Sequence, residues 1–233
     1  MLATLLLGLA LAEASYCGEL PDGKPPASIG RASNGRLEGG VELRDGAAVR
    51  VLPLRHRARC LAFGTPRLVA ALGRAGEAVQ RTHPDSPPLG VGDLSRARGG
   101  PIRAYSRSHQ AGRDADLAFY RLDAAGRPVA TEDLASFDAK GRGPGGSRFD
   151  VARNWALVAA LLSDREVELR WLFVSTPLRE ALLAEGARVK GSRALLARAR
   201  EVLHQPSDAP PHDDHFHLRI LCTERERRGG CVD

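Results

Sequence analysis

The chain has 233 residues, of which 43% are apolar, and a formal net charge of +6. This composition excludes a disordered or fibrous protein, and the length allows one domain with a single hydrophobic core. The basic charge suits an anionic partner such as a cell wall, a nucleic acid or an acidic membrane surface. Because the sequence carries no RNA-binding signature and its aromatic residues are scattered, we expect no nucleic-acid partner.

The amino-terminal residues have the pattern of a secretory signal peptide. The apolar run at residues 2–12 is too short to span a bilayer, and Ala12-Glu13-Ala14 has the small-x-small spacing of a cleavage site. We therefore predict a signal peptide at residues 1–14, a single mature domain at residues 15–233, and no stable membrane insertion after cleavage. No Lys or Arg precedes the run, and a buried amino-terminal helix is the alternative interpretation.

The four cysteines all lie after the predicted cleavage site: Cys17, Cys60, Cys222 and Cys231. None belongs to a CxxC pair, which argues against a zinc ribbon or a thioredoxin-type site. An even number of cysteines in an exported chain favours two disulfides, and three pairings are possible. We predict Cys17 with Cys60 and Cys222 with Cys231, because each closes a local loop. Free buried thiols are the alternative.

The first half of the mature chain carries signals for a hairpin, a helix and a long loop. Residues 41–43 and 47–52 flank Arg44-Asp45-Gly46 and are typical of a hairpin. Thr65 and Pro66 have the positions of a helix cap and a first helical residue. The residues that follow at helical spacing predict one buried stripe, made of Leu68, Leu72, Ala75 and Val79. Residues 84–105 are expected to form a loop.

The second half predicts an α+β fold. The patterns indicate strands at residues 114–122 and 167–174, and helices at residues 150–162, 177–185 and 193–203. The order shows no regular strand-helix-strand alternation, which argues against a doubly wound sheet. We therefore expect a small antiparallel sheet flanked by helices, with long loops.

Residues 215–220 alternate between polar and apolar side chains and predict a strand. Successive side chains of a strand point to opposite faces, so His215, His217 and Arg219 share one face. The opposite face carries Phe216, Leu218 and Ile220 and is expected to pack against the core. The histidine face, with His212 just before it, is suited to a metal ion.

A second polar cluster lies a hundred residues upstream, at residues 108–116. Catalytic zinc usually takes three protein ligands and keeps a fourth position for water, and histidine and carboxylate are common ligands. His109 and Asp116 together with one histidine of the carboxy-terminal strand make such a set. Gly112 allows the chain to turn so that His109 and Asp116 converge on one ion.

These two clusters resemble the motifs of the penicillin-insensitive murein endopeptidases. The matching motifs are Ser108-His109-Gln110-x-Gly112-x-Asp114-x-Asp116 and His212-Asp213-Asp214-His215-Phe216-His217-x-Arg219. Residues 91–95, 99–101 and 149–157 are also similar to that family, and the resemblance covers about residues 29–222. It implies a fold like that of the hedgehog and D-Ala-D-Ala metallopeptidase group, which also includes lysostaphin-type enzymes.

The resemblance also implies an activity and a role for each site residue. The zinc ligands would be His109, Asp116 and His217, with His215 as general base and His212 as a second catalytic histidine. Asp114, and Asp213 or Asp214, are candidates to orient the histidines through the second ring nitrogen. The implied enzyme hydrolyses peptide cross-links of peptidoglycan in the periplasm, with the D-alanyl to meso-diaminopimelyl bond as its substrate.

One departure from the family and two alternative functions accompany this interpretation. Many family members carry a histidine where this chain has Ser106, and we expect metal binding to survive because the ligand triad is untouched. A D,D-carboxypeptidase or dipeptidase of the same group is one alternative, although its usual Glu and Trp-His element does not precede His217. A non-catalytic, zinc-stabilised module that binds the cell wall is the other.

Overall fold

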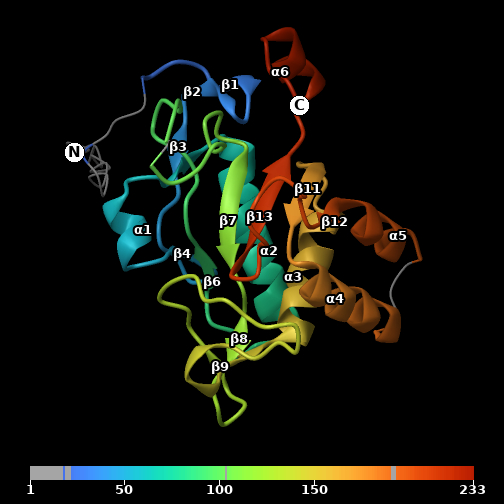
Figure 1. Cartoon of the computed structure of the whole chain (residues 1–233). Helices are drawn as coiled ribbons and strands as arrows, with labels where there is room; N and C mark the ends of the chain where they lie inside the picture. Colours follow the sequence, from blue (N-terminus) through green and yellow to red (C-terminus); the bar gives the residue numbers. More distant parts are fainter. Residues whose placement is uncertain (1–17, 19–21, 103, 190–192) are drawn as a thin grey trace, which may run out of the picture.

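A six-stranded mixed sheet lies at the centre of the computed structural model (Figure 1), which describes residues 18, 22–102, 104–189 and 193–233. The pairs around its middle are antiparallel and the two edge pairs are parallel. The strands, in spatial order, are β12 (Leu203–His204), β11 (Leu169–Phe173), β13 (His215–Ile220), β7 (Asp114–Ala118), β6 (Leu89–Val91) and β4 (Val49–Val51). The predicted α+β class is confirmed, with a sheet that is antiparallel at its centre only.

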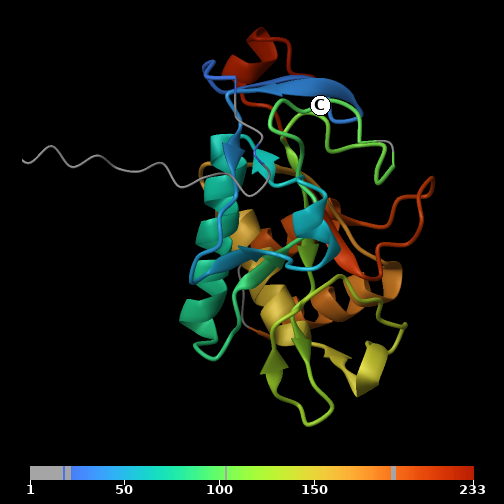
Figure 2. The ribbon, with the colours of Figure 1, turned by 90° about the vertical axis from the view of Figure 1, so that its left-hand side faces the viewer.

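Helices cover one face of this sheet, and Figures 1 and 2 show loops over the opposite face. The four longest described helices are α2 (Pro66–Thr82), α3 (Val151–Ser163), α4 (Thr176–Arg188) and α5 (Arg193–Val202). Helix α3 packs against the other three. Among the described residues, no helix combines the length and the apolar character that a membrane crossing requires.

Short elements surround the central sheet. Two small two-stranded sheets pair β1 (Ala27–Arg31) with β2 (Asn34–Glu38), and β3 (Val41–Glu42) with β5 (Phe63–Gly64). A third small sheet contains β8 (Arg121–Leu122), β9 (Pro128–Val129) and β10 (Arg148–Phe149). The remaining elements are α1 (Arg55–Ala58), the 3-10 turn η1 (Pro144–Gly146) and α6 (Glu224–Arg228).

The predicted helix after Thr65 is confirmed as α2. Its first residue is Pro66, and the predicted stripe of Leu68, Leu72, Ala75 and Val79 is buried. Full burial of a leucine side chain contributes about 1.5–3 kcal/mol. The apolar stripe therefore fixes which side of α2 faces the core.

The hairpin predicted at residues 41–52 is wrong. Its first arm pairs with β5, and its second arm, β4, joins the edge of the central sheet parallel to β6. Asp45 accepts a hydrogen bond from the Val51 amide at 2.9 Å, and Val49 and Val51 are buried. The free energy gained by burying these two valines in the main core thus exceeds the gain from pairing across the local Asp-Gly turn.

Two other predicted segments differ from the structure. The loop expected at residues 84–105 contains β6, and the strand expected at residues 114–122 is divided into β7 and β8. The division has a physical cause: the Tyr120 amide donates to the Asn154 side chain at 3.0 Å and the Tyr120 carbonyl accepts from it at 2.8 Å. A side chain of α3 therefore takes the backbone bonds that a continuous strand would give to a neighbour.

A disulfide and the hydrogen bonds of a buried arginine stabilise the packing of the carboxy-terminus against the domain. The predicted Cys222–Cys231 bond is confirmed. The fully buried Arg113 donates to the carbonyls of Ile220 and Val232 at 2.9 and 2.7 Å. Cys60 is disulfide-bonded, and its predicted partner Cys17 lies outside the described residues, as does the predicted signal peptide.

Candidate active site

The predicted histidine strand, β13, lies between β11 and β7. Its apolar residues Phe216, Leu218 and Ile220 are fully buried, as the alternating pattern predicts. In the antiparallel register with β7, His217 faces Asp116 and Arg219 faces Asp114. Because directly opposed residues of a strand pair project to the same side of a sheet, the histidines of β13 and the aspartates of β7 share the face that the helices leave uncovered.

A tight turn brings His109 to the same place. His109 itself has a left-handed backbone, with φ of 63°, and Gly112 has φ of 68°. A Cβ atom on Gly112 would approach the Leu37 side chain to 2.7 Å. The predicted role of Gly112 in the turn therefore agrees with the structure, whereas nothing in the sequence indicates the unusual backbone of His109.

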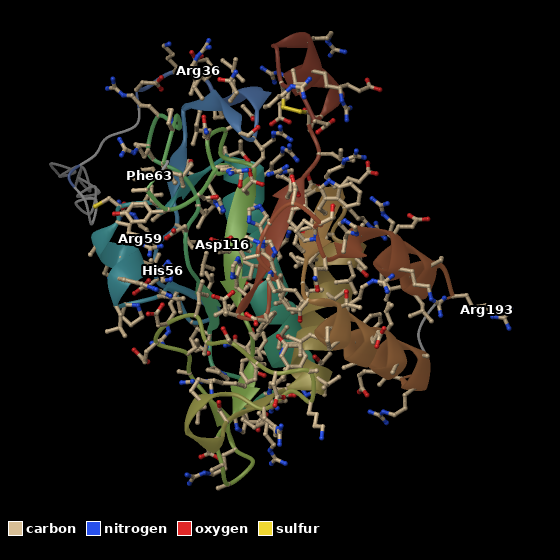
Figure 3. The ribbon with its side chains drawn as sticks, in the orientation of Figure 1. Arg36, His56, Arg59, Phe63, Asp116 and Arg193 are labelled. Atoms are coloured by element: carbon tan, nitrogen blue, oxygen red, sulfur yellow. A yellow bond between two sulfur atoms is a disulfide. The ribbon has the colours of Figure 1, made fainter. Side chains whose placement is uncertain are left out.

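One carboxylate oxygen, Oδ1 of Asp116, is the point on which three imidazoles converge. His109 Nε2 lies 3.2 Å from it, His217 Nδ1 3.1 Å, and His215 Nε2 3.3 Å. Figure 3 shows Asp116 near the centre of the molecule, where β7 and β13 run side by side. The turn at residues 109–112 and two strands thus assemble four polar side chains that lie up to 108 residues apart.

The donor atoms of this cluster fit a metal ion. Both ring nitrogens of His109 and Oδ1 of Asp116 are buried and lack a hydrogen-bond partner. The ligand atoms of His109, Asp116 and His217 all lie within 4.8 Å of one another, as do those of His212, His215 and His217. Four ligands at about 2.0–2.1 Å from zinc would stand about 3.3 Å apart. A cation among these atoms would therefore satisfy groups that the described residues leave without a hydrogen bond.

Two aspartates lie within hydrogen-bond distance of the ring nitrogens of His217 and His215 that face away from Asp116. His217 Nε2 lies 3.1 Å from Asp114 Oδ1, and His215 Nδ1 lies 2.6 Å from Asp214 Oδ1. Metal-binding histidines commonly give their second ring nitrogen to a carboxylate in this way. Of the two candidates that the sequence left open beside Asp114, the structure places Asp214 on a histidine. Asp213 instead accepts a hydrogen bond from the Phe137 amide through its carbonyl oxygen.

The charges of the cluster are strongly coupled. Burial disfavours the charged form of His109, but attraction to Asp116 outweighs it and raises the His109 pKa to about 9. Burial acts in the same direction on His215, and the carboxylates of Asp116 and Asp214 raise its pKa to about 10. Burial would raise the pKa of Asp116, but His109 and His215 hold it well below its usual range. The cluster therefore stabilises a carboxylate surrounded by proton-binding imidazoles.

His212 has the opposite character. Burial, together with repulsion from His215 and His217, lowers its pKa to about 4. Its ring lies 5.1 Å from the ring of His215 and 5.5 Å from that of Phe173, between centroids. His212 is therefore a neutral imidazole at pH 7, and its Nδ1 atom is buried without a hydrogen-bond partner.

The cluster opens into a groove with a volume of about 980 Å³. Its lining includes Tyr105, Ser106 and Arg107, together with residues of the loop at residues 206–214. The hydroxyl oxygen of Ser106 lies 3.3 Å from that of Ser108. The groove gives a ligand of peptide size access to the buried cluster.

The sequence analysis did not predict a buried pair next to the cluster, formed by His56 and Asp93. His56 on α1 lies 2.7 Å from Asp93 through Nδ1, and the Asp93 carbonyl accepts from the Asp116 amide at 3.0 Å. Arg59, which Figure 3 shows near His56, also pairs with Asp93 at 2.6 Å and lies over the Tyr105 ring at 4.3 Å. Asp93 belongs to the recognised motif at residues 91–95, but no pattern around His56 indicates its role.

Comparison with known proteins agrees with the site. The family model of the penicillin-insensitive murein endopeptidases matches residues 28–233, which include every residue of the cluster. No curated protein matches the chain. The match spans most of the chain and both motifs that carry the site, and the chain therefore belongs to the penicillin-insensitive murein endopeptidase family.

Proposed function

We propose that this protein is a zinc-dependent endopeptidase that hydrolyses peptide cross-links of peptidoglycan, at the bond between D-alanine and meso-diaminopimelate. The observation that carries the proposal is the buried polar cluster on the groove floor. His109 is 1% exposed, and neither its ring nitrogens nor Asp116 Oδ1, which lies 3.2 Å from Nε2, makes a hydrogen bond to a described residue. Leaving such groups without a hydrogen bond is costly, which favours a cation as their partner.

The residues that would hold the ion are His109, Asp116 and His217. The Asp114 carboxylate accepts from His217 Nε2 and thereby directs Nδ1 toward Asp116. When bound there, zinc would polarise a carbonyl oxygen and lower the pKa of a coordinated water to about 7.

His215 is the proposed general base. Its Nε2 atom faces the cluster, and its Nδ1 atom is held by Asp214 at 2.6 Å. Nε2 would take the proton of the attacking water, and Asp214 would stabilise the resulting imidazolium. Neutralisation of Asp116 by a bound cation would remove much of the attraction that raises the His215 pKa, and so would bring the base closer to neutral pH.

His212 would act on the oxygen of the reacting carbonyl, beside His215. Because its pKa is lowered to about 4, it is neutral and carries one N–H donor at pH 7. A neutral imidazole donates a hydrogen bond to a developing oxyanion without adding a charge to the site. The proposed role of His212 is therefore to steady the tetrahedral intermediate.

The proposed location is the periplasm. Peptidoglycan lies outside the cytoplasm, and the family acts on murein. The disulfide between Cys222 and Cys231 suits an oxidising compartment. The predicted signal peptide at residues 1–14 would supply the export route.

Digestion of purified cross-linked peptidoglycan tests the proposal. The protein is incubated with the polymer with and without a zinc chelator, and the fragments are identified by mass. We expect dimeric muropeptides to become monomers, and the chelator to stop this until zinc is restored. Loss of only a terminal residue would indicate the carboxypeptidase alternative, and dimers that stay intact in both samples would contradict the proposal.

Replacement of His215 separates an enzyme from a non-catalytic zinc module. His215→Ala is expected to lose muropeptide cleavage by at least about a hundredfold while the bound zinc remains. His83→Ala is the matched control, because His83 lies at the end of α2 outside the groove lining. Unchanged turnover in His215→Ala would remove this residue from the mechanism.

A further inference from the structure

Arg219 occupies a position on the groove floor that the proposed hydrolysis does not use. It follows His217 by two residues on β13, on the same face of the strand. It lines the groove, and 22% of its side chain is exposed.

Only one edge of the Arg219 guanidinium is engaged. Nε donates to Asp114 Oδ1 at 2.6 Å, and the Asp114 side chain is fully buried. Neither terminal nitrogen makes a hydrogen bond to another described residue. Asp114 thus fixes the orientation of the group and leaves its terminal N–H donors for a ligand. This geometry is suited to a planar anion such as a carboxylate.

The charged residues along the groove favour one orientation of a bound peptide. Asp214 Oδ1 lies 2.6 Å from His215 Nδ1, and Asp208 and Asp213 of the loop that leads to His215 also line the groove. His215 and Arg219 lie on opposite sides of His217 along β13. A substrate carboxylate would be repelled at the acidic end and attracted at the arginine end, so the charge pattern selects one orientation of an asymmetric peptide.

We infer that Arg219 binds a free carboxylate of the substrate next to the scissile amide, and that it determines specificity for cross-links carrying that carboxylate. The inference rests on the proposed function. In the proposed cross-link, the carbon that bears the scissile nitrogen also bears a carboxylate, that of the diaminopimelyl residue. Residues two apart on a strand are separated by about 7 Å, so Arg219 reaches the group adjoining a carbonyl placed at His217.

Paired substrates test this inference. Cross-linked dimeric muropeptides are prepared with that diaminopimelyl carboxylate either free or amidated, and kcat/KM is measured for both with the zinc-loaded protein. We expect the free form to be preferred by about tenfold or more, which corresponds to about 1.4 kcal/mol. The Arg219→Gln variant is expected to cleave the two forms at nearly equal rates.

Two further variants separate recognition from folding. Arg219→Lys keeps a positive charge beside Asp114 but loses the planar fork, and we expect it to keep only part of the preference. Arg107→Gln is the matched control, since Arg107 and Arg219 are the arginines among the described residues lining the groove. We expect Arg107→Gln to retain the full preference. Because both substrates meet the same enzyme, the ratio of the two rates does not depend on how much of a variant is folded.

A binding measurement gives a readout without turnover. In the His215→Ala background, the Kd for the free dimer is expected to be about tenfold lower than for the amidated dimer, and Arg219→Gln is expected to abolish the difference. Equal treatment of both dimers by the unmodified protein would overturn the inference while leaving the endopeptidase proposal intact. A preference that survives Arg219→Gln would also overturn it. Failure to cleave either dimer would instead refute the proposed function, and the two Kd values would then decide the inference.

Discussion

His217 and Asp114 are joined through the imidazole nitrogen that faces away from the metal-binding cluster. Nε2 of His217 lies 3.1 Å from Asp114 Oδ1, and this leaves Nδ1 directed at Asp116. Asp114 is fully buried, and Arg219, together with His217, keeps its pKa below the usual range despite the opposing effect of burial. A permanently ionised carboxylate therefore fixes the tautomer of His217.

This relationship predicts the effect of Asp114→Asn. An amide in place of the carboxylate weakens the hold on His217, and loss of such a partner typically reduces metal affinity by about 10- to 100-fold. Zinc affinity is measured by competition with a chromogenic chelator. Asp138→Asn, which removes an exposed partner of Arg142, is the control and should bind zinc as the unmodified protein does. An unchanged affinity in Asp114→Asn would contradict the assignment.

His109→Asn is expected to abolish stabilisation by zinc. Asparagine tolerates the left-handed backbone that His109 adopts. The substitution also removes the attraction between His109 and Asp116, whose Nε2 and Oδ1 atoms lie 3.2 Å apart, so we expect the metal-free melting temperature to fall. Zinc at 100 times its Kd should stabilise the unmodified protein by about 2.7 kcal/mol and leave His109→Asn unaffected. Calorimetry with and without zinc provides the measurement, and His83→Asn should retain the zinc effect.

Two glycines in helices are expected to respond to alanine in opposite ways. A Cβ atom on Gly186 of α4 would lie 2.4 Å from the ring of Trp155 on α3, and Trp155 is buried. We expect Gly186→Ala to destabilise the fold by about 2 kcal/mol. Gly73 of α2 has nothing within 4 Å of the same position, and Gly73→Ala should stabilise by about 0.5–1 kcal/mol. Urea unfolding measures both, and a stabilised Gly186→Ala variant would contradict the packing of α3 against α4.

The Asp164 and Arg74 pair predicts a loss of stability in acid. Burial opposes ionisation of Asp164, but its bond to Arg74 at 2.7 Å lowers the pKa below the ordinary value of 3.8. The contribution of this pair is therefore complete above pH 3.8 and disappears as the pH falls through the lowered pKa. Arg74 is 41% exposed, so solvent screening limits the contribution to about 1 kcal/mol.

Asp164→Asn checks this sign. We expect the variant to be less stable than the unmodified protein at pH 6, and the difference in the free energy of unfolding to shrink toward pH 2.5. A difference that grows as the pH falls would contradict the depressed pKa. Guanidinium unfolding at several pH values provides the measurement.

The sequence by itself determined the helices and the two halves of the candidate site. The apolar spacing from Leu68 to Val79 predicted the buried side of α2, and the alternation at residues 215–220 predicted which side chains of β13 enter the core. Both signals are local, because the periods of a helix and a strand are set by the backbone itself. The two motifs, read as a family resemblance, also identified His109, Asp116 and His217 as candidate ligands.

Only the tertiary structure decided which segments meet. Alternation specifies the face of a strand but not its neighbour, so the register of His217 with Asp116 and the parallel pairing of β4 with β6 depend on how the whole core packs. For the same reason the contact of Asp214 with His215, the burial of His56 behind Asp93 and the free edge of Arg219 could not be predicted from the sequence. Each depends on side chains that are distant in the chain or on a rotamer fixed by its surroundings.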